Sequence, residues 1–530
     1  MNEALAKDLL GWLSGEASRT TRIVKVKGTT TFRSSVAALT RELTRLEQEF
    51  RALASDADPM IAIPEFVDVD DPDVRWLVKS SLATRLTWTL ATTASGTIRS
   101  KELATRCYKK LGEWWAVRFI LTLITADPQS LATTSADAEG LHRVASQQIR
   151  YAWVTRLICT SMAQEVAQNP VASQRIPELT PGAVDALLDA TIGYFTTGTL
   201  NLSQPAKALA QNFAQRAGSL AGRPLQDAIF HRDINAKPWI LYPNGELLPI
   251  ATLPAALGLE HAVLQLADDR LASLRLPATS KGEFFERVTQ LCLADALNIQ
   301  PASTGRPLKV RVSPADEGEL DGALGNPVEV IFECKARMTP NGIGGIGGAF
   351  ETDVVAAIGQ VRERLDALTT GRSPIVDATG ARFVRAEEVS GICVLAHPYG
   401  GSVVNPMMLD LTTAERDLVP IVAADIHTWI IVATALGSTA ELRSFLKFRN
   451  RHYRWRIYAT EEVDLLISFL NPNRSELTRA MSQSKVLRPD ANQLMGGCSV
   501  PLDCSLLTPK PQPGRTWRQL LYAHAEVTNP

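Results

Sequence analysis

The residues with the clearest capacity for chemistry lie in one stretch that begins at Asp321 and ends at Lys335. Its charged residues include two carboxylates, Asp321 and Glu333, and one amine, Lys335. Carboxylates that converge supply the hard oxygen ligands that a divalent cation such as Mg²⁺ prefers. A bound cation lowers the pKa of its water and offsets the charge that grows on a phosphate, while a lysine can position that water. These residues predict metal-assisted phosphodiester hydrolysis, with an ordinary surface hairpin as the alternative.

A predicted strand over residues 328–335 positions two of these groups. Apolar residues alternate there with Glu333 and Lys335, and a strand sends alternate side chains to opposite faces. Glu333 and Lys335 should therefore project from the same side. The Asn-Pro pair just before this strand predicts a turn, and the glycine-containing segment before that pair is expected to end another strand. Asp321 is thus expected beside Glu333 on a neighbouring strand.

A helix is expected on each side of this region. Residues 281–296 have helical spacing, with Ser280 as a cap, and Glu286 falls on the side of that helix that carries its apolar stripe. Residues 351–368 form a second predicted helix, which carries Gln360. The apolar run over residues 391–396 predicts a strand after it.

This order of elements resembles the PD-(D/E)XK nuclease superfamily, which has the restriction-endonuclease-like fold. In that family a helix with a Glu precedes a sheet with an Asp and a Glu-x-Lys, and a helix that often bears a Gln follows. The resemblance covers about residues 280–396 and aligns five positions with the family's catalytic residues. These positions are Glu286, Asp321, Glu333, Lys335 and Gln360.

The resemblance implies a site for Mg²⁺, or for Mn²⁺, formed by Asp321, Glu333 and the backbone carbonyl of Cys334. Lys335 would orient the attacking water. DNA is the implied substrate, because the superfamily mostly cuts DNA. Two alternatives remain open: a non-catalytic DNA-binding or complex-forming subunit that retains the fold, and a nuclease that acts on RNA or branched DNA.

A basic, aromatic segment over residues 443–456 is a candidate for nucleic-acid contact, since such segments can bind a phosphate backbone. A solvated helix face with a buried aromatic stripe is the alternative. Three arginines from the nuclease-like region are expected on the same surface. The full predicted set is Arg337, Arg362, Arg364, Arg443, Lys447, Arg449, Arg451, Arg454 and Arg456.

The chain as a whole is predicted to be α+β, with a helical N-terminal half and a C-terminal nuclease core whose mixed central sheet is flanked by helices. Its 530 residues allow about three domains. The expected divisions are a helical domain over 1–217, a connector with a β-hairpin over 218–275, the nuclease-like domain over 276–470, and an irregular extension over 471–530. Within the first, residues 34–54 are expected to form an amphipathic helix.

Composition narrows the class of protein. A hydrophobic content of 45% and a charged content of 21% are those of a globular protein without membrane segments. The net charge of -1 gives no overall attraction to nucleic acid. Seven scattered cysteines without a C-x-x-C pair predict reduced thiols and a cytoplasmic location, and they argue against zinc.

Several residues outside the nuclease-like region have two interpretations. Trp114 and Trp115 are expected in the core, with base stacking as the alternative. His427 is expected to be a core histidine rather than a ligand. The large helical half suggests target sensing, self-association into a homo-oligomer or docking of a companion protein. This domain plan resembles nucleases of prokaryotic anti-phage defence, by family-level analogy.

Overall fold

The computed structural model describes residues 32–66, 83–125, 152–250, 258–272, 281–301, 308–337, 351–396, 421–453 and 462–470, apart from isolated positions within these ranges, and a few residues between 67 and 74. The chain is α+β, as expected. The extension predicted over 471–530 lies outside the described residues.

The contacts divide the chain into two compact units that alternate along the sequence. Unit 1 comprises Met1–Gln147, Ala214–Ala255 and Asn341–Gly347, and unit 2 comprises Gln148–Phe213, Ala256–Pro340 and Gly348–Pro530. The predicted divisions are consecutive stretches, so they differ from these units. A segment of the predicted helical half belongs to the same unit as the predicted nuclease core.

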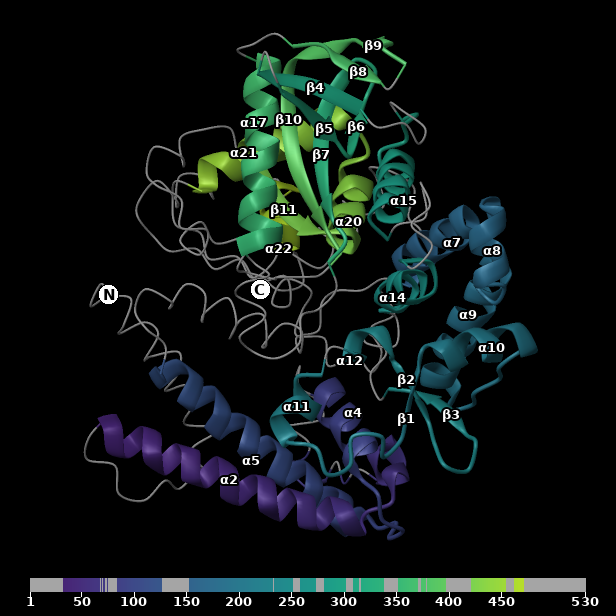
Figure 1. Cartoon of the computed structure of the whole chain (residues 1–530), viewed down its shortest axis with the longest axis vertical. Coiled ribbons are helices and arrows are strands. Elements are labelled where there is room, and N and C mark those ends of the chain that lie inside the picture. The colour runs from purple at the N-terminus through teal and green to yellow at the C-terminus, as the bar shows by residue number, and fades with distance from the viewer. Residues whose placement is uncertain are drawn as a thin grey trace, which may run out of the picture. The chain divides into compact units, whose positions relative to one another are not determined.

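Unit 1 is built on two long helices, α2 (Phe32–Asp56) and α5 (Lys101–Thr125), which contact each other along their length (Figure 1). The predicted amphipathic helix over 34–54 is confirmed, because its apolar stripe is buried and its other face is exposed. Trp114 and Trp115 are buried against Phe230, which confirms the core interpretation.

The remaining elements of unit 1 are short. They are η1 (Pro59–Ala62), η2 (Pro64–Phe66), α4 (Ala83–Thr93), β1 (Ala214–Arg216), α11 (Leu225–Ile229), α12 (Asp233–Ala236), β2 (Trp239–Leu241) and β3 (Leu247–Pro249). Strands β2 and β3 form the predicted β-hairpin, with Asn244 and Gly245 in the connection between them, and β1 joins β2 in parallel as a third strand.

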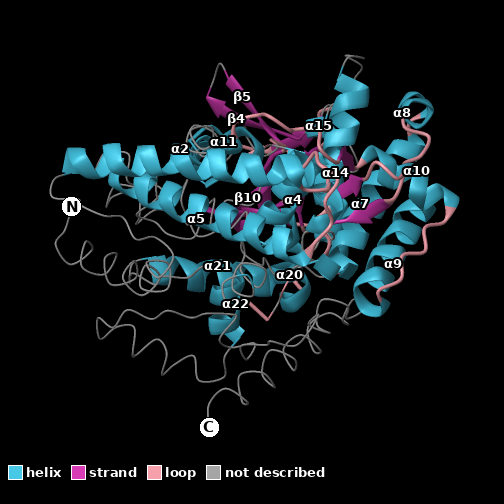
Figure 2. Ribbon diagram, turned by 90° about the horizontal axis from the view of Figure 1, so that it is seen from below, coloured by secondary structure: helices cyan, strands magenta, loops and turns pink. Residues whose placement is uncertain are grey.

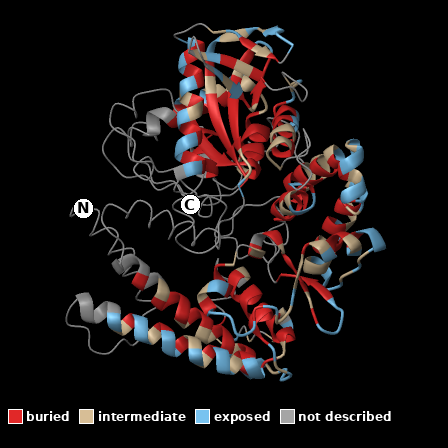
Figure 3. Cartoon of the chain, viewed as in Figure 1, coloured by how far each residue is buried: buried red, intermediate tan, exposed pale blue. Residues whose placement is uncertain are grey.

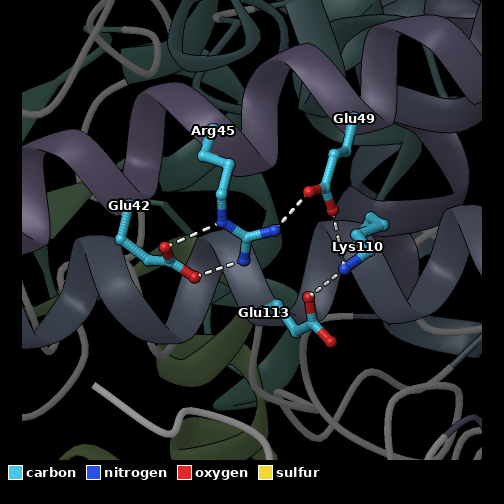
Figure 4. A network of polar contacts seen from close by, with 5 residues as sticks. All are labelled: Glu42, Arg45, Glu49, Lys110 and Glu113. Carbon is cyan, nitrogen blue, oxygen red and sulfur yellow. Dashed lines mark hydrogen bonds and ion pairs between the residues drawn. The ribbon is translucent and has the colours of Figure 1, made fainter. Parts of the chain in front are cut away.

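A network of ion pairs lies along α2 and α5 (Figure 4), and in it the pair of Glu49 with Lys110 joins the two helices. Arg45 contacts both Glu42 and Glu49, while the Lys110 Nζ lies 3.0 Å from Glu49 and 2.7 Å from Glu113. Exposed pairs of this kind contribute about 0 to 1 kcal/mol each. The buried apolar stripe of α2 therefore supplies most of the stability of this helix pair.

Unit 2 begins with a layer of helices: α7 (Ala152–Gln168), α8 (Pro170–Arg175), α9 (Pro181–Thr197), α10 (Gln204–Asn212) and α14 (Leu259–Leu271). Helices α7 and α14 contact α15 (Lys281–Ala296), which has the predicted bounds. Helix α7 is also tied to α15 by an ion pair in which the Arg287 Nε lies 2.6 Å from the Glu165 Oε2.

Two four-stranded sheets follow in unit 2. The mixed sheet has the order β11-β10-β7-β6, from β6 (Gly322–Leu324), β7 (Val328–Lys335), β10 (Arg385–Leu395) and β11 (Ile421–Asp425). Strands β7, β10 and β11 are parallel, and β6 is antiparallel to β7. The second sheet is antiparallel, with the order β5-β4-β8-β9, from β4 (Leu308–Ser313), β5 (Asp316–Leu320), β8 (Ile375–Asp377) and β9 (Arg382–Phe383).

Helices cover both faces of the mixed sheet, as predicted for its core. A π-helical turn, η4 (Glu351–Val355), leads into α17 (Ala356–Thr369), which crosses over between the parallel strands β7 and β10. Helix α15 contacts β6 and β7 from the other side, as Figure 1 shows. The strands between these layers are buried (Figure 3), and Figure 2 shows the same elements by type of structure.

The apolar run over residues 421–436 is not a single element. It consists of β11 and the separate helix α20 (Ile426–Leu436), with the Asp425 carboxylate accepting a hydrogen bond from the Thr428 N–H at the junction. Helices α21 (Thr439–Tyr453) and α22 (Glu462–Leu470) follow and contact each other. No helix among the described residues is long and apolar enough to cross a membrane.

The close approach of α17 to β10 predicts the effect of two alanine substitutions. A Cβ at Gly391 of β10 would lie 2.2 Å from the Val361 Cγ1, so Gly391→Ala should destabilise the chain by about 1–3 kcal/mol through overpacking. A Cβ at Gly359 of α17 meets no atom within 4 Å, so Gly359→Ala should stabilise by roughly 0.5–1 kcal/mol. Urea unfolding measures both, and equal stabilities would contradict this packing.

Candidate active site

Asp321 lies where the two sheets of unit 2 meet, between β5 and β6. Gly322 pairs with Phe332 in the antiparallel register of β6 and β7, so the residue before Gly322 lies beside the residue after Phe332. The expected neighbourhood of Asp321 and Glu333 is thereby confirmed. The Cys334 N–H donates a hydrogen bond of 2.6 Å to the Asp321 Oδ2, which fixes the carboxylate against β7.

Glu333 and Lys335 project from the same side of β7, as their spacing predicts. The Lys335 Nζ donates to the Glu333 Oε1 at 2.9 Å and to the Gln360 Oε1 of α17 at 2.8 Å. The side chain of Glu333 is 6% exposed and that of Lys335 is 24% exposed, so the amine lies nearer the surface. Three positions from two elements thus form one hydrogen-bonded group.

Arg364 is part of this group, although its sequence context predicts a surface contact with nucleic acid. Its Nη1 lies 3.0 Å from the Glu333 Oε2, and its side chain is 11% exposed. Residues four apart lie on the same face of a helix, so Arg364 points to the same side of α17 as Gln360. That spacing is the sequence signal that could have placed Arg364 in the site.

Negative charge is concentrated around Asp321 and Glu286. Burial, and then the charges of Glu333 and Glu286, raises the pKa of Asp321 to about 8. Burial, and then the charges of Glu319, Glu283 and Glu333, raises the pKa of Glu286 on α15 to about 7. The carboxylates of α15, β5 and β7 therefore interact electrostatically, which places the helix acid near the strand acids, as the family resemblance implies.

Adjacent residues of β7 face opposite layers of unit 2. The Cys334 thiol lies close to the Thr289 side chain of α15, while Glu333 contacts Arg364 of α17. Burial raises the pKa of the Cys334 thiol well above its usual value, so the thiol is a neutral core group. The role predicted for Cys334 concerns its backbone carbonyl and stays a prediction.

The carboxylates fit a divalent cation in their donor chemistry. The buried Glu333 Oε2 accepts no hydrogen bond, and burial, together with nearby carboxylates, raises the pKa values of Asp321 and Glu286. Within the described part of the chain, no group of three or more His, Cys, Asp or Glu residues is arranged as a metal cage. Mg²⁺ needs no such cage, because one or two carboxylates, waters and substrate phosphates commonly hold it.

Those of the predicted nucleic-acid contacts whose side chains the structure describes do not form one free basic surface. Arg337 pairs with Asp353 at 2.8 Å, Arg443 with Glu329 at 3.0 Å, and Lys447 with Glu388. Arg362 is half-buried on α17. The side chains of Arg451, Arg454 and Arg456 lie outside the described residues.

The prediction that Arg449 lies on a nucleic-acid-binding surface is wrong. It is 0% exposed, and its Nε lies 2.8 Å from the Glu462 Oε1, which is also buried. A guanidinium in this position joins α21 to α22 and cannot reach a phosphate backbone. Phe445 and Phe448 are buried on the same helix against Phe469, so the described part of the segment has the buried aromatic stripe of the alternative reading.

His427 is a buried residue of α20, as expected for a core histidine. It is 2% exposed, and its Nδ1 lies 3.8 Å from the Glu260 Oε1 of α14. It lies on different elements from the residues of the candidate site.

Comparison with family models, curated proteins and solved structures found no match to this chain.

The raised pKa values predict how stability depends on pH in the absence of metal. A carboxyl group with a raised folded pKa keeps a proton that the unfolded chain loses near pH 4, so stability falls as pH rises from there. For Asp321 this fall should continue to about pH 8. Asp321→Asn removes that contribution. Between about pH 4 and pH 8, the free energy of unfolding of the variant should therefore rise relative to that of wild type by up to about 1.4 kcal/mol per pH unit.

Urea unfolding with a chelator at pH 5, 7 and 9 measures this difference. Glu317→Gln serves as the control, since Glu317 is an exposed carboxylate of β5. Parallel pH curves for wild type and Asp321→Asn would mean that the Asp321 carboxyl does not have a raised pKa.

Proposed function

We propose that this chain is a metal-dependent nuclease that hydrolyses phosphodiester bonds, with DNA as its substrate. The observation that carries the proposal is the grouping of Asp321, Glu333, Lys335 and Gln360. These residues span forty positions of sequence and come from a strand junction, a strand and a helix, yet hydrogen bonds join Glu333, Lys335 and Gln360 directly. A structural core has no need for this set of charged groups, because burying charge is costly.

Each residue has a role that follows from its position. Asp321 and Glu333 would hold the cation, with the Cys334 carbonyl as a third oxygen. Such a cation, when bound, supplies a water of lowered pKa and offsets charge on the phosphate. Lys335, fixed by Gln360 and Glu333, can orient a water by hydrogen bonding. Glu286, with a pKa of about 7, can exchange a proton at neutral pH.

The choice of DNA rests on the resemblance to the PD-(D/E)XK superfamily, as does the nuclease identity of the mixed-sheet core. The domain plan supports, by family-level analogy, a role in prokaryotic defence against phage. The scattered cysteines favour the cytoplasm, and the large helical half favours a companion protein or a homo-oligomer. The mixed sheet with helices on both faces is compatible with that core.

Plasmid cleavage tests the proposal directly. Wild type should cut plasmid DNA with Mg²⁺ or Mn²⁺ and not with EDTA. Asp321→Ala and Lys335→Ala should each lower the rate by about two orders of magnitude or more, because the first removes a ligand of the cation that offsets charge on the phosphate and the second removes the amine that orients the water. Glu317→Ala and Lys309→Ala, which remove an exposed ion pair between β4 and β5, should cut like wild type.

Further substrates separate the alternatives. If the protein cut single-stranded RNA or a DNA junction in preference to plasmid, the proposed nuclease activity would stand, but its substrate would be RNA or branched DNA. Metal-dependent cutting that survives both site substitutions would refute the assigned site. Salt-dependent binding of DNA without cutting of any substrate would favour the non-catalytic subunit.

A further inference from the structure

The two oxygens of Glu333 are held in different ways. Oε1 accepts a hydrogen bond from the Lys335 Nζ, and that amine is fixed a second time by Gln360. Oε2 is buried and accepts no hydrogen bond, although the Arg364 Nη1 lies 3.0 Å away. The contact with Arg364 is thus an ion pair without hydrogen-bond geometry. Oε2 is the oxygen of Glu333 with unused capacity for a ligand.

The guanidinium of Arg364 has N–H groups that donate no hydrogen bond, just as the nearby Glu333 Oε2 accepts none. Arg364 is 9% exposed, and neither its Nε nor its Nη1 makes a hydrogen bond within the described chain. Gly318 of β5 lies close against it, since a Cβ there would lie 3.4 Å from the Nε and 3.5 Å from the Cγ. A buried donor without a partner is costly, and a guanidinium fits the paired oxygens of a phosphate better than any other side chain.

We propose that Arg364 is an exchangeable counter-ion of the site, an inference that rests on the proposed nuclease function. Without metal, its charge offsets that of Glu333. When a divalent cation takes Oε2, the guanidinium turns its free N–H groups to the scissile phosphate. One exchange satisfies both groups that lack a hydrogen bond, because the carboxylate oxygen gains a cation and the guanidinium gains an oxygen acceptor.

The exchange gives Arg364 opposite effects on metal binding and on cleavage. Its positive charge competes with the cation for Oε2, so its removal should tighten metal binding. Its N–H groups would offset charge on the phosphate during attack, so its removal should slow the reaction. A residue that only supports the fold would weaken both when removed, which makes the combination diagnostic.

The experiment compares Mn²⁺ affinity, measured by calorimetry on the metal-free protein, with single-turnover plasmid cleavage at saturating Mn²⁺. Arg364→Met should bind Mn²⁺ several-fold more tightly and cut on the order of 100-fold more slowly. Arg311→Met, which removes an exposed arginine of β4, should match wild type in both. Unchanged or weaker Mn²⁺ affinity in a folded Arg364→Met, or an unchanged rate, would overturn the proposal.

Arg364→Lys keeps the test decisive if loss of the buried charge unfolds the chain. It retains the charge and loses the planar fork, so Mn²⁺ affinity should stay within about twofold of wild type while cleavage slows at least tenfold. Full activity of Arg364→Lys would overturn the phosphate contact. If wild type itself neither bound Mn²⁺ nor cut DNA, the proposed function would fail too. If wild type bound Mn²⁺ and cut DNA, and the Arg364 variants had the same affinity and rate, only this inference would fail.

Discussion

The antiparallel pairing of β6 with β7 is the interaction on which the candidate site depends. It places Asp321 beside Glu333, and a hydrogen bond from the Cys334 N–H holds the Asp321 carboxylate in place. The pairing requires a glycine at 322, because a Cβ there would lie 2.0 Å from the ring of Phe332. Burial raises the pKa values of Asp321 and Glu286, and the negative charges of nearby carboxylates raise them further.

The positive charges that offset the charge of Glu333 come from Lys335 of β7 and from Arg364 of α17, the helix that covers the sheet. From α17, Arg364 contacts Glu333, and Gln360 accepts a hydrogen bond from Lys335. The depth of α17 over the sheet therefore sets the electrostatic balance of the site. That depth is fixed at Gly391, where the helix lies against the backbone of β10. Apolar packing at Gly391, two residues from Glu333 along the paired strands, thus controls the distances between the charged groups.

Much of the site's framework could be predicted from local patterns. The alternation over 328–335 gave the bounds of β7 and the shared face of Glu333 and Lys335, since strand periodicity is a local property. The helical spacing over 281–296 likewise gave α15. The turn before β7 was visible in its Asn-Pro pair, so the neighbourhood of Asp321 and Glu333 could be predicted as well.

The features that sequence did not predict depend on tertiary contacts. Arg364 and Arg449 have the composition of surface cations, and only the carboxylates of Glu333 and Glu462 explain why they are buried. The run over 421–436 is mostly apolar, so its division into β11 and α20 leaves no clear periodic signal. The predicted divisions also assumed that each domain is one continuous stretch.

The interleaving of the two units has a consequence for any fragment of this chain. Arg85 of α4 donates a hydrogen bond of 2.8 Å to the carbonyl of Ile229, and the indole of Trp88 donates to the carbonyl of Lys237. Both acceptors come from the segment Ala214–Ala255, which follows an excursion of the chain through unit 2. A fragment that ended at residue 217 would bury a guanidinium without its acceptor and expose Trp114 and Trp115. Unit 1 is therefore finished only after part of unit 2 has been synthesised, which couples the folding of the two during translation.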